Sequence, residues 1–425
     1  MATGKALNGK PYAGNPHVRC DEGEVASAAT SRRGSLLYNS TLFATIAAVA
    51  ASAVMSAMAD TYKDRYGLTW TYTVTSGTDV KLTAVDDKKA IFAASNIPWT
   101  FTNNDTDYTV TAIGGSLCSG WTTLSGPLTI PAAVKTMGSN AFDGCKGLTG
   151  LTIEEGLTSL PYTRTFYSCE GLSGPLIIPH SVEYIGRQTF LWLGEHLTSV
   201  WFKGPNAVAS GEQPYTTLDY YSGNILYPHD KLGLKVALFG LYTKPGEDSS
   251  NLILRALTGC ILYLPRNGYW LEEKLDSYFS GTMSLLYYGA GEELDISINE
   301  AENIISATPT TVNALTNVLK SVAVFKSDFG LDTKISVTNA IDMSGMTITD
   351  EMSAALKFDS LVFSVKTQAQ LNDLLSAFPE NVPFAIDPTG LAEDMVVPNN
   401  REVFVKAGVG YDVIKLKSGF VLIVM

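Results

Sequence analysis

The sequence predicts an α+β protein in which a short solenoid, with one β-strand per repeat and a β cap before it, is followed by a small α+β domain with β-α-β units. Three patterns lead to this prediction. Residues 104–203 repeat about every 24 positions, residues 69–74 alternate between polar and apolar side chains, and residues 312–322 and 368–378 carry apolar side chains at intervals of three and four.

The repeat is clearest in a heptapeptide that occurs twice. Residues 125–131 (SGPLTIP) return as residues 173–179 (SGPLIIP), 48 positions later. Four units follow, at about 104–127, 128–150, 151–174 and 175–200. A unit of this length cannot bury its apolar face alone, so stacked copies should align their apolar residues in one core. The expected ladder consists of Phe142, Phe166 and Phe190, of Cys145 and Cys169, and of Leu124, Leu148 and Leu172.

Residues 128–150 (LTIPAAVKTMGSNAFDGCKGLTG) closely resemble the BspA-type leucine-rich repeat, whose usual form is L-x-I-P-x-x-V-x-x-I-G-x-x-A-F-x-G-C-x-x-L. The match is good at 176–200 and partial at 104–127 and 151–174, and it covers about a quarter of the chain. Residues 161–164 (PYTR) and the pair Leu193-Gly194 depart from the motif. The resemblance implies a leucine-rich-repeat solenoid in a secreted or surface-attached protein, typically bacterial, that takes part in adhesion and protein binding.

The resemblance also bears on the cysteines. Cys145 and Cys169 occupy the cysteine position of the motif, where a small buried hydrophobic side chain packs in a ladder. A disulfide or a metal pair is the alternative. The chain has no C-x-x-C spacing that would support zinc.

Composition limits the classes of partner. Hydrophobic residues make up 45% of the chain, which is enough for a sizeable core. Acidic residues outnumber basic ones by 42 to 30, whereas phosphate binding needs clustered lysine and arginine. We therefore expect no nucleic-acid partner.

Residues 1–59 predict a signal peptide with a long n-region. Arg32 and Arg33 precede an apolar run at 42–54, which is shorter than the roughly 20 residues that span a bilayer. Ala57 and Ala59 fit the small-x-small pattern that a signal peptidase cleaves, so Asp60 would be the first mature residue. We expect general secretion and no stable membrane span after signal removal. An uncleaved anchor and the twin-arginine route are the alternatives.

The remaining segments are assigned by pattern. Residues 60–103 are expected to form the N-terminal β cap. Residues 204–293 are rich in aromatic residues and glycine, which predicts an irregular, strand-rich flank on the C-terminal side of the solenoid. Residues 294–425 predict the α+β domain, with helices at 312–322 and 368–378 and strands at 334–337, 361–365 and 383–386.

The sequence gives no sign of catalysis. It has no H-E-x-x-H, no G-x-S-x-G and no phosphate-binding glycine loop. His180, His196 and His229 lie in turn-like contexts and are expected at the surface. We therefore expect no enzyme activity, no cofactor and no metal.

Strand residues that point away from the core are the better candidates for a binding site, because stacked repeats present them as one concave surface. Trp201 and Ile177 are apolar yet expected to point outward, which favours a contact role. The alternative is that a capping segment covers them. The full candidate set is Thr129, Thr152, Glu154, Ile177, Trp201 and Lys203.

These patterns together favour an exported surface protein that binds an extracellular protein through the concave face of the solenoid. Two other functions stay open. One is a structural, self-assembling envelope protein. The other is a carbohydrate-binding accessory module with a polysaccharide ligand, which the 20 tyrosines and 6 tryptophans suggest.

Overall fold

The computed structural model describes residues 59–204, 234–239, 259–265, 284–339 and 341–389, and short strands at 395–396, 404–406 and 421–422. Within these ranges it leaves out residues 183, 188, 191, 195, 290, 344–345, 358, 379–381 and 388. The described chain is rich in strands and has few helices. The expected signal segment, including Ala57, lies outside the described residues, whereas Ala59 and Asp60 are described and exposed.

An N-terminal sheet precedes the repeats. Its strands lie in the order β1 (Asp60–Lys63), β2 (Thr69–Ser76), β3 (Asp79–Val85), β6 (Thr106–Ile113) and β5 (Thr100–Asn103). The alternation expected at 69–74 places Trp70 and Tyr72 of β2 in the core. Strand β6 also pairs in parallel with β8 (Thr136–Met137), so this sheet extends beyond residue 103 and connects directly to the repeats.

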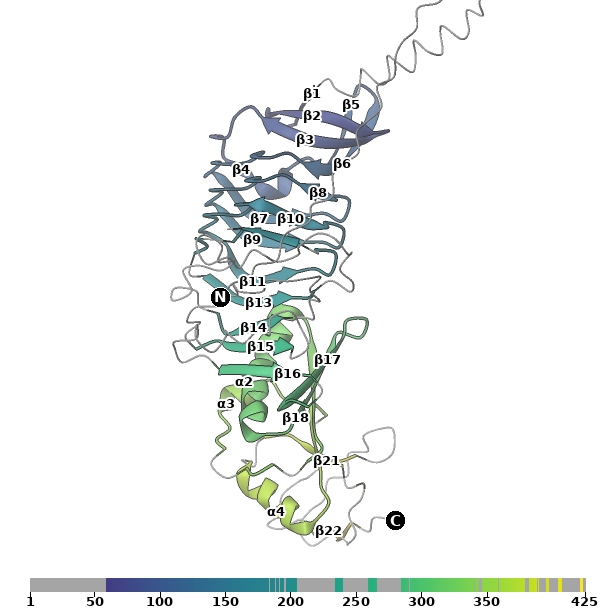
Figure 1. Cartoon of the computed structure of the whole chain (residues 1–425), viewed down its shortest axis with the longest axis vertical. Coiled ribbons are helices and arrows are strands. Elements are labelled where there is room, and N and C mark those ends of the chain that lie inside the picture. The colour runs from purple at the N-terminus through teal and green to yellow at the C-terminus, as the bar shows by residue number, and fades with distance from the viewer. Residues whose placement is uncertain are drawn as a thin grey trace, which may run out of the picture. The chain divides into compact units, whose positions relative to one another are not determined.

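The repeats stack their strands in parallel (Figure 1). The strands are β4 (Phe92–Ala93), β7 (Leu124–Ile130), β9 (Leu148–Ile153), β11 (Ser173–Ile178) and β13 (His196–Phe202). Thr129 of β7 lies beside Thr152 of β9, and Ile177 of β11 lies beside Trp201 of β13. Between β9 and β11 the Ser173 hydroxyl donates to the Thr149 carbonyl at 2.7 Å. A second row contains β10 (Ser159–Thr163) and β12 (Tyr184–Arg187), which also run parallel.

The core of this stack is the phenylalanine ladder. The ring centroids of Phe142 and Phe166 are 5.5 Å apart, and those of Phe166 and Phe190 are 5.6 Å apart. The two rings of each pair are stacked and nearly parallel, with angles of 7° and 2° between their planes. All three rings are fully buried. The spacing of 24 residues therefore corresponds to one turn of the stack.

A glycine sets the distance between two neighbouring turns. A Cβ added at Gly138 would lie 2.2 Å from the backbone nitrogen of Gly115 and 2.6 Å from the carbonyl carbon of Gly114. No side chain fits in that space. The Gly of the I-G pair in the repeat is thus required by close backbone approach.

Beyond β13 the parallel stacking continues after one longer step: Ser199 pairs with Val236, 37 positions later, and the next two steps, Val236 to Ile261 and Ile261 to Ser284, are again close to 24 positions. Strands β14 (Val236–Phe239), β15 (Ile261–Pro265) and β16 (Ser284–Tyr288) follow β13 in parallel register. The same sheet then includes β17 (Leu294–Asn299) and β18 (Ile304–Pro309), an antiparallel pair. Most of the expected flank at 204–293 lies outside the described residues.

Parallel strands connected through helices form the last part of the sheet. The order is β18, β19 (Asp332–Val337), β20 (Leu361–Ser364), β21 (Ala385–Asp387) and β23 (Phe404–Val405), and β22 (Met395–Val396) pairs with β24 (Val421–Leu422). The helices between them are α2 (Val312–Phe329), α3 (Asp350–Ala354) and α4 (Gln368–Ala377). Helix α2 is longer than the expected 312–322, and it ends at Gly330, which has a left-handed backbone conformation. The side chain of Thr311 caps the N-terminus of α2, and that of Thr367 caps the N-terminus of α4.

Candidate functional site

One row of outward side chains runs across seven neighbouring parallel strands. The pairing of β7 with β9 aligns Thr129 with Thr152, and the pairings from β11 to β16 align Ile177, Trp201, Leu238, Tyr263 and Leu286. The hydrogen bond from Ser173 Oγ to the Thr149 carbonyl connects the two stretches. Four of the residues predicted from the sequence to bind a ligand therefore have direct neighbours in this row: Thr129, Thr152, Ile177 and Trp201. The row is not uniform, however, because its two ends differ in what covers them.

The first end is open to solvent. Thr129, Thr152 and Glu154 are exposed, as is Pro127, and Gly150 between them is half-buried. We call these five residues the open face. The Glu154 carboxylate accepts a hydrogen bond from the Ala132 backbone N–H at 2.9 Å, which holds one of its oxygens at the strand end. The open face is therefore polar and low in side-chain bulk.

The second end is covered. Trp201 is only 3% exposed, and its ring lies against Phe329 of α2 at a centroid distance of 5.4 Å. Ile177 is half-buried and packs against the same apolar cluster. Trp201 is thus not an open contact residue: helix α2 is the covering segment that the alternative interpretation proposed.

Polar contacts hold α2 on the strands. The Tyr263 hydroxyl, from β15, lies 3.1 Å from the Asn317 carbonyl and 2.7 Å from Ser321 Oγ, both on the helix. Near the other end of α2, Asp328 Oδ2 accepts hydrogen bonds from Thr198 Oγ1 and Ser199 Oγ at 2.6 and 2.7 Å. Burial raises the pKa of Asp328, but the hydrogen bond from Ser327 Oγ, together with those from Thr198 and Ser199, outweighs it and keeps the pKa below its ordinary value.

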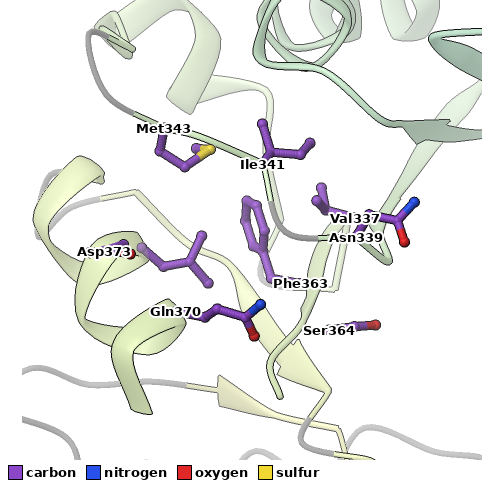
Figure 2. A pocket seen from close by; sticks show the side chains of 9 residues that line it. Val337, Asn339, Ile341, Met343, Phe363, Ser364, Gln370 and Asp373 are labelled. Atoms are coloured by element: carbon purple, nitrogen blue, oxygen red, sulfur yellow. The ribbon is translucent and has the colours of Figure 1, made fainter. Parts of the chain in front are cut away.

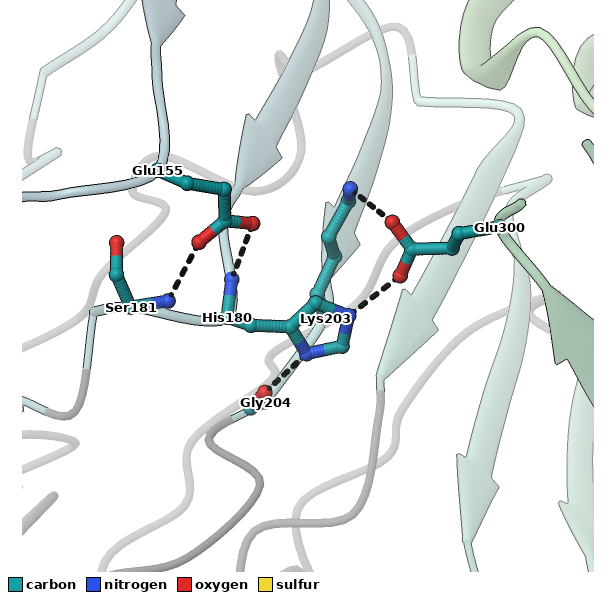
Figure 3. A network of polar contacts seen from close by, with 6 residues as sticks. All are labelled: Glu155, His180, Ser181, Lys203, Gly204 and Glu300. Carbon is teal, nitrogen blue, oxygen red and sulfur yellow. Dashed lines mark hydrogen bonds and ion pairs between the residues drawn. The ribbon is translucent and has the colours of Figure 1, made fainter. Parts of the chain in front are cut away.

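A polar network marks the border between the open and covered ends (Figure 3). Glu300, in the turn between β17 and β18, accepts from Lys203 Nζ at 2.6 Å and contacts His180 Nε2 through its other oxygen. His180 Nδ1 lies 2.7 Å from the Gly204 carbonyl oxygen. Glu155 accepts hydrogen bonds from the backbone N–H groups of His180 and Ser181 at 3.1 and 2.9 Å.

The chemistry of this network depends on protonation. Both ring nitrogens of His180 face acceptor oxygens, so only the imidazolium form can donate both hydrogen bonds. Burial raises the pKa of Glu300, but the hydrogen bonds from Lys203 and His180 lower it by more, so the pKa lies below its ordinary value. Lys203 also lies over the Trp201 ring, 4.7 Å from its centroid. Lys203, a predicted ligand-binding residue, is therefore engaged within the chain.

Comparison with known proteins identifies the repeats. The family model of the BspA type leucine rich repeat region matches residues 100–208 in six copies. These residues form a BspA-type leucine-rich-repeat region. The matched range agrees with the expected 104–203, whereas the number of copies exceeds the four units that the spacing suggested. No curated protein matches the chain.

The chain is also similar to three solved structures of leucine-rich proteins. The leucine-rich repeat protein from Bacteroides capillosus ATCC 29799 is 27% identical, over 31% of this chain and 91% of its own, with a TM-score of 0.25. The leucine-rich repeat protein from Bacteroides ovatus ATCC 8483 is 16% identical, over 76% of this chain and 68% of its own, with a TM-score of 0.30. A leucine rich cell surface protein from Faecalibacterium prausnitzii A2-165 is 13% identical, over 77% of this chain and 94% of its own, with a TM-score of 0.26.

The cysteines of the leucine-rich-repeat region are part of its core. Cys118, Cys145 and Cys169 are free and fully buried, and the thiols of Cys145 and Cys169 donate to the carbonyls of Cys118 and Phe142. Burial raises the pKa of Cys145 to about 12. Such thiols stay protonated and pack as small hydrophobic groups.

A cavity of about 70 Å³ lies outside the leucine-rich-repeat region, where β19 and β20 end (Figure 2). Its apolar lining includes Val337, Met343 and Phe363, and Gln370 and Asp373 of α4 line its other side. The sequence interpretation did not find this cavity. Its signal would have been the position at the carboxyl ends of parallel strands, where ligands often bind in α/β sheets.

No group of three or more histidine, cysteine, aspartate or glutamate side chains among the described residues could hold a metal ion. None of the described helices is long and apolar enough to cross a membrane.

Proposed function

We propose that the chain is an exported surface protein that binds an extracellular protein through the open face of its leucine-rich-repeat solenoid. The observation that carries this proposal is the exposure of Thr129 and Thr152 on two adjacent strands, next to a row that α2 covers. The family resemblance supports a role in protein interaction. The small-x-small pattern at Ala57 and Ala59 supports export.

The composition of the open face suits a partner that approaches the strands closely. Gly150 and Pro127 add little bulk, and the structure gives the Thr129 and Thr152 side chains no hydrogen-bond partner among the residues it describes. Glu154 adds a single negative charge at one edge. A partner that offers hydrogen-bond donors and acceptors on a flat surface, with a basic group opposite Glu154, would match these groups.

The site is narrower than the sequence suggested. Thr129, Thr152 and Glu154 remain as ligand-binding candidates, and Ile177 lies at the margin. Trp201 and Lys203 make contacts within the chain instead. Trp201 packs against Phe329 of α2, and Lys203 donates a hydrogen bond to Glu300. We therefore place the ligand over β7 and β9.

The proposal is tested by blocking the open face without disturbing the core. Thr152→Arg and Thr129→Arg each add a long charged side chain at an exposed position. Thr78→Arg, in the exposed turn between β2 and β3, is the matched control. Binding is measured by biolayer interferometry against a panel of purified extracellular matrix and serum proteins. We expect at least one partner whose binding is lost by both open-face variants and kept by the control.

Two outcomes would contradict the proposal. One is that no protein of the panel binds the wild-type chain, and the other is that the open-face variants bind as the wild type does. Light scattering of the same samples addresses the structural alternative, because a self-assembling envelope protein would form larger species as its concentration increases.

A further inference from the structure

Two neighbouring cavities lie where β19 and β20 end, in the last part of the large sheet. The inner one is the cavity of about 70 Å³ in Figure 2. The outer one is more open, has a volume of about 390 Å³ and shares Ile341, Met343 and Asp373 with the inner one. The two adjoin, so they form one site with a small inner end and a wide mouth. In sheets of parallel strands with helices, ligands commonly bind outside the carboxyl ends of the strands.

The inner end is apolar and is built from buried side chains. Val337 is the last residue of β19, Phe363 belongs to β20, Met343 comes from the segment that follows β19, and all three are buried. Leu374 of α4, also buried, completes the apolar lining. Figure 2 shows Phe363 pointing toward Ile341, between α4 and the end of β19. Because closely packed side chains hold its walls, this end is preformed for an apolar group.

The size of the inner end limits the group that it can hold. An apolar cavity of about 150 Å³ holds one benzene molecule. The inner end, at about 70 Å³, is less than half that size and is too small for an aromatic ring. A short aliphatic chain of about three or four carbon atoms matches it better.

Acidic side chains line the mouth. Asp373 of α4 is exposed and borders both cavities, and Asp342 borders the outer one. The Asp373 carboxylate has no hydrogen bond or ion pair with another residue that the structure describes. Ser376 also borders the outer cavity, and its hydroxyl donates to the Asn372 carbonyl at 2.8 Å, which leaves its lone pairs to accept. The mouth therefore offers acceptors and negative charge to a cation.

We propose that this site binds a short aliphatic primary amine. The alkyl chain occupies the inner end beside Val337, Met343 and Phe363, and the ammonium group donates hydrogen bonds to the Asp373 carboxylate and to Ser376 Oγ. The site is separate from the open face of the leucine-rich-repeat region, and neither proposal depends on the other.

The methyl group of Met343 allows binding at this site to be followed directly. Isotope-labelled methionine methyl groups are observed by NMR, and Met343→Leu identifies the Met343 signal. Ethylamine, propylamine and butylamine are each titrated at constant ionic strength and about pH 7, where a primary amine is protonated. Butanol and butyrate, which have the same chain length as butylamine, test the role of the charge.

We expect saturable shifts of the Met343 signal, with a dissociation constant for butylamine on the order of 1–10 mM. Each CH₂ group added from ethylamine to butylamine should tighten binding by about three- to fourfold, because it is buried in the inner end. Butanol should bind more weakly than butylamine, and butyrate should give no saturable shift.

Two substitutions separate the mouth from the inner end. Asp373→Asn removes a charge at an exposed position, so it should weaken butylamine binding by about two- to fivefold and leave butanol binding unchanged. Val337→Ile adds one CH₂ group to the inner end, so it should weaken the binding of butylamine more than that of ethylamine. Asp295→Asn, at an exposed position of β17 outside both cavities, and Thr152→Arg are the controls and should bind butylamine as the wild type does.

The charge test does not depend on Val337→Ile, because Asp373 lies at the surface and its substitution leaves the core intact. The proposal is overturned if butylamine gives no saturable shift of the Met343 signal, or if affinity does not increase with chain length. It is also overturned if butyrate binds as tightly as butylamine, or if Asp373→Asn binds butylamine as the wild type does. None of these results depends on a protein binding to the open face, so failure of this proposal is distinct from failure of that one.

Discussion

The ring of Trp201 lies 5.4 Å from the ring of Phe329, measured between centroids. Trp201 belongs to β13 of the leucine-rich-repeat region, and Phe329 is the last residue of α2. This contact divides the row of outward side chains into an open end at β7 and β9 and a covered end from β13 onward. The proposed ligand site depends on that division.

The buried hydroxyl of Tyr263 should contribute measurably to holding α2 on the strands. Tyr263→Phe removes its contacts with the Asn317 carbonyl and Ser321 Oγ while keeping the ring that packs against Phe325 at 5.6 Å. We expect the free energy of unfolding to fall by about 1–2 kcal/mol, as for a buried hydrogen bond. Urea unfolding followed by circular dichroism measures it. Tyr66→Phe, at an exposed tyrosine, should change it little, and equal effects of the two variants would contradict the role of Tyr263.

The middle ring of the phenylalanine ladder should be among the most sensitive core positions. Phe166 stacks on Phe142 on one side and on Phe190 on the other. Phe166→Ala therefore leaves a cavity with two apolar walls, and we expect a loss of about 3–5 kcal/mol in the free energy of unfolding. Ile91→Ala, at a residue that is 88% exposed, should stay within about 0.5 kcal/mol of the wild type. A small loss for Phe166→Ala would show that the rings do not stack.

The same change at two glycines of the stack should reduce stability by very different amounts. Gly138→Ala places a methyl group 2.2 Å from the Gly115 nitrogen and should destabilise the protein by about 3 kcal/mol or more, or prevent folding. Gly150→Ala places it 3.6 Å from Pro127 Cβ, which is ordinary contact, and should change stability by less than about 1 kcal/mol. Thermal unfolding of both variants compares them. Similar melting temperatures would contradict the close approach at Gly138.

Acid should weaken the network around Glu300. Its pKa is lowered in the folded state from an ordinary value of 4.5, so the folded protein binds this proton less readily than the unfolded chain does. The stabilisation is therefore present above about pH 5 and is lost as the pH falls through the lower, folded-state pKa. Urea unfolding at several pH values should show the wild type more stable than Glu300→Gln near pH 6, with the difference shrinking toward pH 3. A difference that grows toward pH 3 would contradict this sign.

The repeat architecture could be predicted from the sequence because its determinants are local and periodic. Phe142, Phe166 and Phe190 recur with the period of one turn, so their stacking follows from spacing. The strand pairing of Ile177 with Trp201 follows from the same register. Helix α2 was predicted because Leu315, Leu319 and their apolar neighbours recur at helical intervals.

The cover over Trp201 could not be derived in the same way. Phe329 lies far along the chain, and no periodic signal connects a repeat strand with a helix of another segment. The pairing of His180 with Glu300, 120 residues apart, is hidden for the same reason.

Cysteine labelling tests the division of the outward row most directly. The native Cys118, Cys145, Cys169 and Cys260 are buried, so Thr152→Cys and Ser199→Cys can be compared in a Cys20→Ser background with a maleimide dye. Thr152 is exposed, whereas Ser199 is fully buried beside Asp328 of α2. We predict that the cysteine at 152 reacts at least about 100-fold faster than the one at 199, which should react only when α2 leaves the strands or the protein unfolds. Equal rates at the two positions would contradict the division and, with it, the placement of the ligand over β7 and β9.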